Sequence, residues 1–190
     1  MKKKTVRKQP TIACCGIDCG LCPRYYIQGS SKCPGCGGEQ FYEKHPSCGI
    51  LTCCTINHNF ETCATCKDFP CSKFENWDVK DSFVSHKNSI SNLLQIRKSG
   101  LTSFLDLQMR RIKVLTVLIQ EFDDGKSKSK YCTAAALLPI SSLEQIIQVI
   151  NKKIQKNNAS QPEIKIKARL IKAEIDMVSN RENIALTLRK

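Results

Sequence analysis

The sequence has no apolar run that approaches 18 residues, and only 6% of its residues are aromatic. A helix that crosses a bilayer needs about 20 apolar residues, so we expect no membrane-spanning segment. The basic start, Met1–Pro10, lacks the apolar stretch of a secretion signal, and we expect a cytoplasmic protein with a disordered basic tail over residues 1–10. The shares of hydrophobic residues (41%) and charged residues (25%) are typical of a globular chain.

Cysteine and glycine are nearly missing from the second half of the chain. Residues 75–190 contain one cysteine and two glycines, whereas the other twelve cysteines lie between positions 14 and 71. A segment of about 60 residues cannot easily bury enough apolar surface to fold unaided. We therefore predict a small metal-stabilised cysteine-rich module followed by a mainly α-helical part with minor β-structure. The predicted boundaries are 11–74 for the module, 75–155 for the helical part, and 156–190 for a linker, a terminal helix and a short strand.

Three C-x2-C pairs mark the module: Cys19–Cys22, Cys33–Cys36 and Cys63–Cys66. Such a gap lets both thiolates bind one tetrahedral ion while backbone N–H groups point back at the sulfurs. Disulfides are the other way to hold such a segment, but they belong to exported chains. The expected ligands are the ten best-spaced cysteines: Cys15, Cys19, Cys22, Cys33, Cys36, Cys48, Cys53, Cys63, Cys66 and Cys71.

Two four-thiolate sites would use eight of these ten ligands, so we predict about two ions. A third site would need twelve cysteines, and it would have to recruit Cys14 and Cys54, the second members of two doublets, or Cys132. The spacing leaves open which cysteines share an ion. It also leaves open the role of these three additional cysteines.

Zinc is the expected metal, and an iron–sulfur cluster is the alternative. Paired C-x2-C motifs in a glycine-rich segment fit closed structural zinc sites. The spacing C-x3-C-x2-C from Cys15 to Cys22 is that of radical S-adenosylmethionine enzymes, but the barrel that follows in those enzymes is missing. The ferredoxin pattern C-x2-C-x2-C-x3-C-P does not occur either. Prolines directly after Cys22 and Cys33 keep a cluster as the alternative.

Apolar residues recur at helical spacing beyond residue 80. We expect five helices. The first carries a stripe of Phe83, Ile90, Leu93, Leu94 and Arg97 and is stopped by Gly100, the second runs from Thr102 to Phe122, and a short buried helix covers Tyr131–Leu138. The fourth begins with a Ser141–Glu144 capping box, and the last begins at Pro162 and carries Ile164–Val178. Alternation over Ile184–Leu188 predicts a half-buried strand, with Thr11–Cys14 as its nearest candidate partner.

No Ser–His–Asp set, phosphate loop or carboxylate pair can be placed, so we do not expect an enzyme. His45 and His58 lack a ligand-spaced histidine partner, and we expect both to be exposed loop residues. The chain has a net charge of +13, and residues 126–172 carry +8 of it. Such a stretch is either a lysine-rich solvated surface or a weak, non-specific nucleic-acid contact. The main functional expectation is a binding or adaptor module for an unknown protein partner.

The cysteine motifs resemble the cysteine-rich family of bacteria and archaea called domain of unknown function 3795. The segments that carry the resemblance are Cys15–Pro23, Cys33–Cys36, Cys48–Cys53, Cys63–Cys71 with its Phe69-Pro70-Cys71 end, Asp124–Cys132 and Ala135–Pro139. The resemblance covers residues 11–150, and Lys126 stands where an arginine is common. It implies a cytoplasmic prokaryotic protein whose cysteines form a shared metal-binding set. It implies no activity, because the family is uncharacterised.

Overall fold

Two compact units divide the chain in the computed structural model, which describes residues 6–156 and 163–190. Unit 1 consists of Met1–Gln108 together with Leu188–Lys190, and unit 2 of Met109–Thr187. Two stretches lie outside the described residues: residues 1–5 of the predicted tail, and residues 157–162 of the predicted linker, which include Pro162. The division after Gln108 differs from the predicted one after residue 74.

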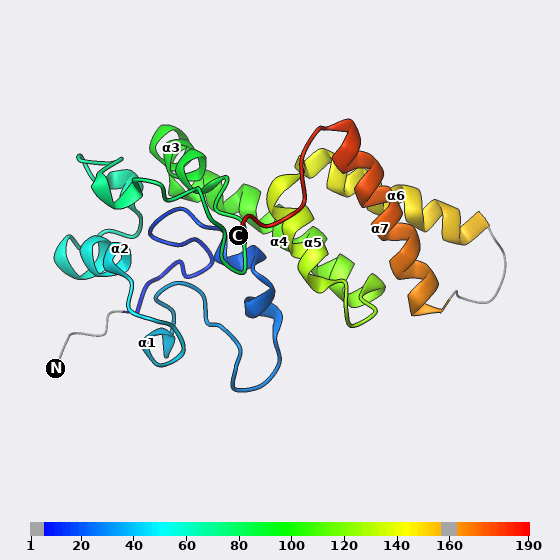
Figure 1. The fold of residues 1–190 in the computed structure, drawn as a ribbon, viewed down its shortest axis with the longest axis horizontal. Helices are drawn as coiled ribbons and strands as arrows, with labels where there is room; N and C mark the ends of the chain where they lie inside the picture. The colour runs from blue at the N-terminus through cyan, green and yellow to red at the C-terminus, as the bar shows by residue number, and fades with distance from the viewer. Residues whose placement is uncertain (1–5, 157–162) are drawn as a thin grey trace. The chain divides into compact units, whose positions relative to one another are not determined.

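The described residues are mainly helical and contain no β-strand (Figure 1). The short elements are η1 (Cys19–Leu21), η2 (Pro23–Tyr26), η4 (Cys63–Thr65) and η5 (Ser72–Phe74), all 3-10 turns, the helices α1 (Phe41–Lys44) and α2 (Gly49–Leu51), and the π-helical turn η3 (Thr52–Asn57). The long helices are α3 (Ser89–Ser99), α4 (Leu101–Phe122), α5 (Lys128–Leu137), α6 (Ile140–Lys156) and α7 (Ile164–Arg181). Along these described stretches no helix is both long and apolar enough to cross a membrane.

The core of unit 1 contains residues of the cysteine-rich segment and of the two helices that follow it. Ile12 and Leu51 from the segment and Leu93 from α3 are all completely or almost completely buried, and Phe104 of α4 belongs to the same cluster. The cysteine-rich segment therefore does not form a separate module. It shares its core with α3 and the first part of α4, which explains why unit 1 extends to Gln108.

Gly16 lets the first cysteine motif lie directly against α3. Its φ is +86°, and a Cβ at this position would stand 2.1 Å from the carbonyl oxygen of Ser89. The hydroxyl of Ser89 donates a hydrogen bond to the carbonyl of Cys15. The carboxylate of Asp18 accepts hydrogen bonds from Asn92 and Gln108 at 2.8 and 2.9 Å. The segment from Cys15 to Asp18 is thus fixed by side chains of α3 and α4.

The predicted stripe for α3 is only partly correct. The helix begins at Ser89, so Phe83 precedes it and is exposed, and Leu94 within it is also exposed. Leu93 and Ile96 are the buried apolar residues of the helix. The predicted stop at Gly100 is confirmed, because Gly100 caps the helix with a φ of +87° and its N–H bonds to the carbonyl of Ile96.

Unit 2 consists of the second part of α4 and the helices α5 to α7. The predicted stripe of α7 is only partly correct, because Ala168, Ile171, Ile175 and Val178 are buried but Ile164 at its start is exposed. Phe122 ends α4, and the Asp123 carboxylate then accepts hydrogen bonds from the backbone of the following turn. The helices α6 and α7 pack against each other (Figure 1). The predicted capping box is wrong, because α6 begins at Ile140 and places Ser141 inside the helix, while the carbonyl of Pro139 accepts a bond from Leu143 N–H.

The predicted strand near the C-terminus is wrong as well. Residues 184–188 alternate between half-buried and exposed side chains, as the sequence suggested, but they pair with no strand among the described residues. The predicted partner segment is engaged elsewhere, since the carbonyls of Thr11 and Cys14 accept bonds from Gly20 and Cys63. An alternating pattern needs a partner strand to form a sheet, and the described residues contain no strand.

Candidate metal centre

Arg7 lies within the tail, residues 1–10, that the sequence predicted to be disordered, but its side chain has a fixed position in unit 1. Its side chain is fully buried, and its guanidinium donates hydrogen bonds to the carbonyls of Ile12 and Cys36 at 2.8 and 2.9 Å and to the carbonyl of Glu61. The Glu61 carboxylate lies 3.5 Å from the same group. A buried guanidinium of this kind links three parts of the cysteine-rich segment, so the ordered chain begins before residue 11.

Next to Arg7 lies a network of buried thiols that includes both cysteines the sequence left without a role. The thiols of Cys36 and Cys54 are hydrogen-bonded to Cys14, and these bonds, aided by the nearby Arg7 charge, lower the pKa of Cys14. The Cys54 thiol also lies beside the sulfur of Cys63 and 3.4 Å from the carbonyl of Phe60. Cys14 and Cys54 are therefore part of the interior of unit 1.

A second group of thiols surrounds Cys19. Burial raises the pKa of Cys19, and the neighbouring thiols of Cys15, Cys22 and Cys33 raise it further. Backbone N–H groups point at these sulfurs: those of Arg24 and Tyr25 at Cys22, and that of Ile17 at Cys15. This is the local geometry that the C-x2-C spacing predicts, because amide donors stabilise thiolates.

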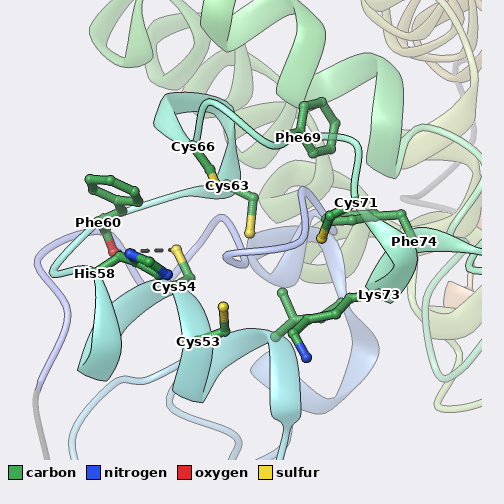
Figure 2. A pocket seen from close by; sticks show the side chains of 11 residues that line it. Cys53, Cys54, His58, Phe60, Cys63, Cys66, Phe69, Cys71, Lys73 and Phe74 are labelled. Atoms are coloured by element: carbon green, nitrogen blue, oxygen red, sulfur yellow. Dashed lines mark hydrogen bonds between the residues drawn. The ribbon is translucent and has the colours of Figure 1, made fainter.

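A third group of cysteines lines a pocket in unit 1 (Figure 2). Its cavity volume is about 30 Å³, and the pocket is partly open to solvent. The lining comes from η3, η4, η5 and the segments beside them, and it consists of Ile50, Cys53, Cys54, His58, Phe60, Cys63, Cys66, Phe69, Cys71, Lys73 and Phe74. Figure 2 shows the sulfurs of Cys53, Cys63 and Cys71 directed into the space between the elements.

Arg97 holds the loop that carries two of these cysteines. Its guanidinium donates hydrogen bonds to the carbonyls of Ala64 at 2.9 Å, Cys66 at 2.8 Å and Phe69 at 3.3 Å. It also lies over the ring of Phe69, 5.1 Å from the ring centre. The sequence placed Arg97 in the apolar stripe of α3, and a helical stripe gave no sign that this arginine positions a cysteine motif.

The ten predicted ligands thus all lie in unit 1, but they are not arranged there as complete metal sites. Within residues 6–156 and 163–190, no group of three or more His, Cys, Asp or Glu side chains is arranged so that it could hold a metal ion. No disulfide joins any of the cysteines in these ranges. Cys48 caps α2, where its sulfur accepts the N–H of Leu51 at 3.5 Å.

The histidines and the remaining cysteine have simple environments. His45 is exposed and stacks on Phe41, as a loop histidine would. His58 is exposed too, but it also lines the pocket and stacks on Phe60. Cys132 is buried in α5 of unit 2, which confirms the expectation of a buried position.

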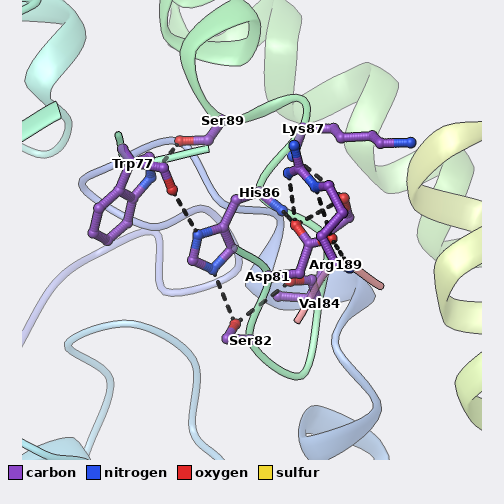
Figure 3. A network of polar contacts seen from close by, with 9 residues as sticks. Trp77, Asp81, Ser82, Val84, His86, Lys87, Ser89 and Arg189 are labelled. Atoms are coloured by element: carbon purple, nitrogen blue, oxygen red, sulfur yellow. Dashed lines mark hydrogen bonds and ion pairs between the residues drawn. The ribbon is translucent and has the colours of Figure 1, made fainter. Parts of the chain in front are cut away.

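A polar network outside the cysteines surrounds Asp81 (Figure 3). Its carboxylate is fully buried and accepts hydrogen bonds from the N–H and the guanidinium of Arg189 and from the N–H of His86. The His86 ring stacks on Trp77, whose indole N–H donates to Ser89 at 2.8 Å. This network fixes residues 188–190 to unit 1, and it is a structural clamp.

The basic stretch is less basic in the folded protein than its sequence window indicates. Three of its ten cations form ion pairs with acidic residues just outside the window: Lys130 with Asp176, Lys153 with Glu174 and Lys172 with Asp124. Widening the window to residues 123–176 reduces the net charge from +8 to +4. Nucleic-acid binding gains no support from this pairing and stays a prediction.

Comparisons with family models, with curated proteins and with solved structures find no match to this chain. The resemblance to the domain of unknown function 3795 therefore rests on the sequence motifs alone and stays a prediction.

Proposed function

We propose that unit 1 is a metal-binding module whose ligands are thiolates and whose metal contributes to its stability. The observation that carries the proposal is the set of thiols in the interior of one small unit, with backbone N–H donors directed at the sulfurs of Cys15, Cys22 and Cys48. Thiolates bound to a metal are stabilised by such donors. Unit 2 would then serve as the part that contacts a protein partner, which makes the whole chain a binding or adaptor protein.

Zinc and an iron–sulfur cluster are the two metal centres that this chemistry allows. The C-x2-C pairs around Cys19 favour zinc, because such pairs occur in closed tetrahedral sites. The wider arrangement of thiols around the pocket favours a cluster, as argued below. Both choices require reduced thiols, so the purified protein should be kept under reducing conditions.

The test is the metal content and stability of Cys66→Ser, with Cys132→Ser as the matched control. A serine hydroxyl is a poor ligand for either metal centre, and metal-binding free energy in small zinc modules is about 10–16 kcal/mol and doubles as folding free energy. We expect Cys66→Ser to lose bound metal and to expose unit 1 to protease. Cys132→Ser should retain the wild-type metal content. Equal metal content in Cys66→Ser and the wild type, or a wild type that binds no metal, would refute the proposal.

A further inference from the structure

Four of the predicted ligands line the pocket in unit 1, although the sequence spacing did not show that they belong to one site. We infer that it binds an iron–sulfur cluster of the [4Fe–4S] type through four thiolates: Cys53, Cys63, Cys66 and Cys71. This inference rests on the proposed function, metal binding by thiolates, and adds the class of cofactor and the residues that share it.

The spread of the four cysteines over three elements favours a cluster over a single ion. A zinc–sulfur bond of about 2.3 Å places the four sulfurs of a tetrahedral site about 3.8 Å apart. Five cysteines line this one pocket, and four of them are predicted ligands. In a [4Fe–4S] cluster each thiolate binds a different iron atom, so the sulfurs surround a much larger body. Thiols spread around a pocket fit that requirement.

The four cysteines reach the pocket from three different elements (Figure 2). Cys53 lies in the π-helical turn η3, Cys63 in η4, Cys66 directly after it, and Cys71 directly before η5. Single π-helical turns occur often at functional sites, because the widened turn redirects one side chain. A body held at four points by three elements would tie them together, which matches the shortage of regular structure in this part of unit 1.

Cys54 also lines the pocket, but it is assigned a different role. Its sulfur lies 3.4 Å from the carbonyl oxygen of Phe60 and belongs to the buried network with Cys14. Cys54 is 3% exposed, so it lies deeper than the half-buried Cys53 beside it. We therefore treat Cys54 as a neighbour of the cluster rather than a ligand.

The walls of the pocket suit a cluster with four thiolates. Ile50, Phe60, Phe69 and Phe74 form apolar sides, which keep water away from the iron–sulfur core. The exposed Lys73 is the cation of the lining, and it would balance part of the negative charge that four thiolates bring. Arg97 donates hydrogen bonds to the carbonyls of Cys66 and of Ala64, the residue after Cys63, so the loop is oriented before any metal binds.

The first experiment measures what the wild-type chain contains after anaerobic purification, and again after metal-free protein is incubated with ferric iron, sulfide and a thiol that supplies the reducing electrons. We expect about four iron and four acid-labile sulfide ions for each cluster, with the broad visible absorbance of thiolate-bound iron. Zinc without sulfide would overturn the inference and leave the proposed function standing. Protein without any metal in both preparations would overturn both.

The second experiment identifies the ligands in the wild type, so it does not depend on whether a variant folds. Thiols are alkylated before and after the cluster is destroyed by acid and a chelator, and the modified peptides are quantified by mass spectrometry. We expect the four proposed ligands to be protected together and released together, while the reactivity of Cys132 does not follow cluster loss. Protection of a different set of cysteines would overturn the assignment.

A pair of variants completes the test at the pocket itself. Cys66→Ala should lose one cluster, seen as a loss of about four sulfide ions per chain, whereas Cys54→Ala should keep it. The two residues line the same pocket, so loss of stability alone would affect both. Sulfide content that falls equally in both variants, or in Cys54→Ala alone, would contradict the assignment of ligands.

Discussion

Asp81 fixes residues 188–190 to unit 1, and replacing it tests how much that clamp contributes. Its carboxylate accepts hydrogen bonds from Arg189 N–H at 2.7 Å, from Arg189 Nη2 at 2.8 Å and from His86 N–H at 2.7 Å. Asp81→Ala leaves two backbone donors and a guanidinium without their acceptor. Losing one partner of a buried pair costs about 3–5 kcal/mol, and Arg189 is one-third exposed and partly hydrated, so we expect a loss of about 3 kcal/mol.

The assay is equilibrium unfolding in denaturant of Asp81→Ala, Arg189→Ala and the double variant. Because both single changes remove the same interaction, the double variant should lose much less than the sum of the two. Asp106→Ala, an exposed aspartate on α4, is the control and should stay within about 0.5 kcal/mol of the wild type. A loss below that limit for Asp81→Ala, or strictly additive losses, would refute the reasoning.

The same clamp has a pH dependence with a definite sign. Burial alone would raise the pKa of Asp81, but the hydrogen bonds and charge of Arg189 outweigh it and hold this pKa well below its ordinary value. The stability from the ionised carboxylate is therefore fully present above the unfolded pKa of about 3.9 and is lost as the pH falls through the folded value. The difference in unfolding free energy between wild type and Asp81→Ala should narrow below about pH 4. A difference that widens toward acid would contradict this sign.

Two further changes test how the cysteine motifs are supported. Gly16→Ala places a Cβ on a left-handed backbone, 2.1 Å from the Ser89 carbonyl oxygen, so thermal unfolding should show that the unfolding free energy falls by more than about 2 kcal/mol. Gly49→Ala is the control, because open space surrounds Gly49 and the unfolding free energy should change little. Equal shifts in melting temperature would contradict this. Arg97→Lys should lose most of three carbonyl hydrogen bonds, lower stability by about 1–2 kcal/mol and speed metal loss to a chelator, with the exposed Lys98→Ala as control. Identical chelation rates would refute that role.

The long helices could be predicted from the sequence because their signals are local. Apolar spacing and stop residues such as Gly100 and Pro139 act within a few turns, and α3 to α7 lie where those signals place them. The errors arose where a pattern was extended without a tertiary partner. Phe83 was added to a helix that had not begun, and the alternating residues 184–188 had no strand to pair with.

The candidate site could be predicted only at the level of pairs. A C-x2-C spacing brings its own two sulfurs together, and the N–H donors seen at Cys22 follow from that local geometry. It carries no information on Cys53, which reaches the pocket of Cys63 and Cys66 only through the fold of unit 1. The buried position of Arg7 was missed for the same reason, since all its side-chain acceptors except Ile12 lie about 30 or more residues away.

The place of residues 188–190 in unit 1 has a consequence for the synthesis of the chain. Unit 1 is discontinuous, and all of unit 2, about 80 residues, is translated between Gln108 and Leu188. At about 5–20 residues per second, this delay lasts roughly 4–16 seconds. Throughout that time a nascent unit 1 has all twelve of its cysteines but lacks the partner of Asp81. During this time the thiols can bind metal in a unit that is less stable than the complete one by about 3 kcal/mol, and residues 188–190 complete the unit when they are translated.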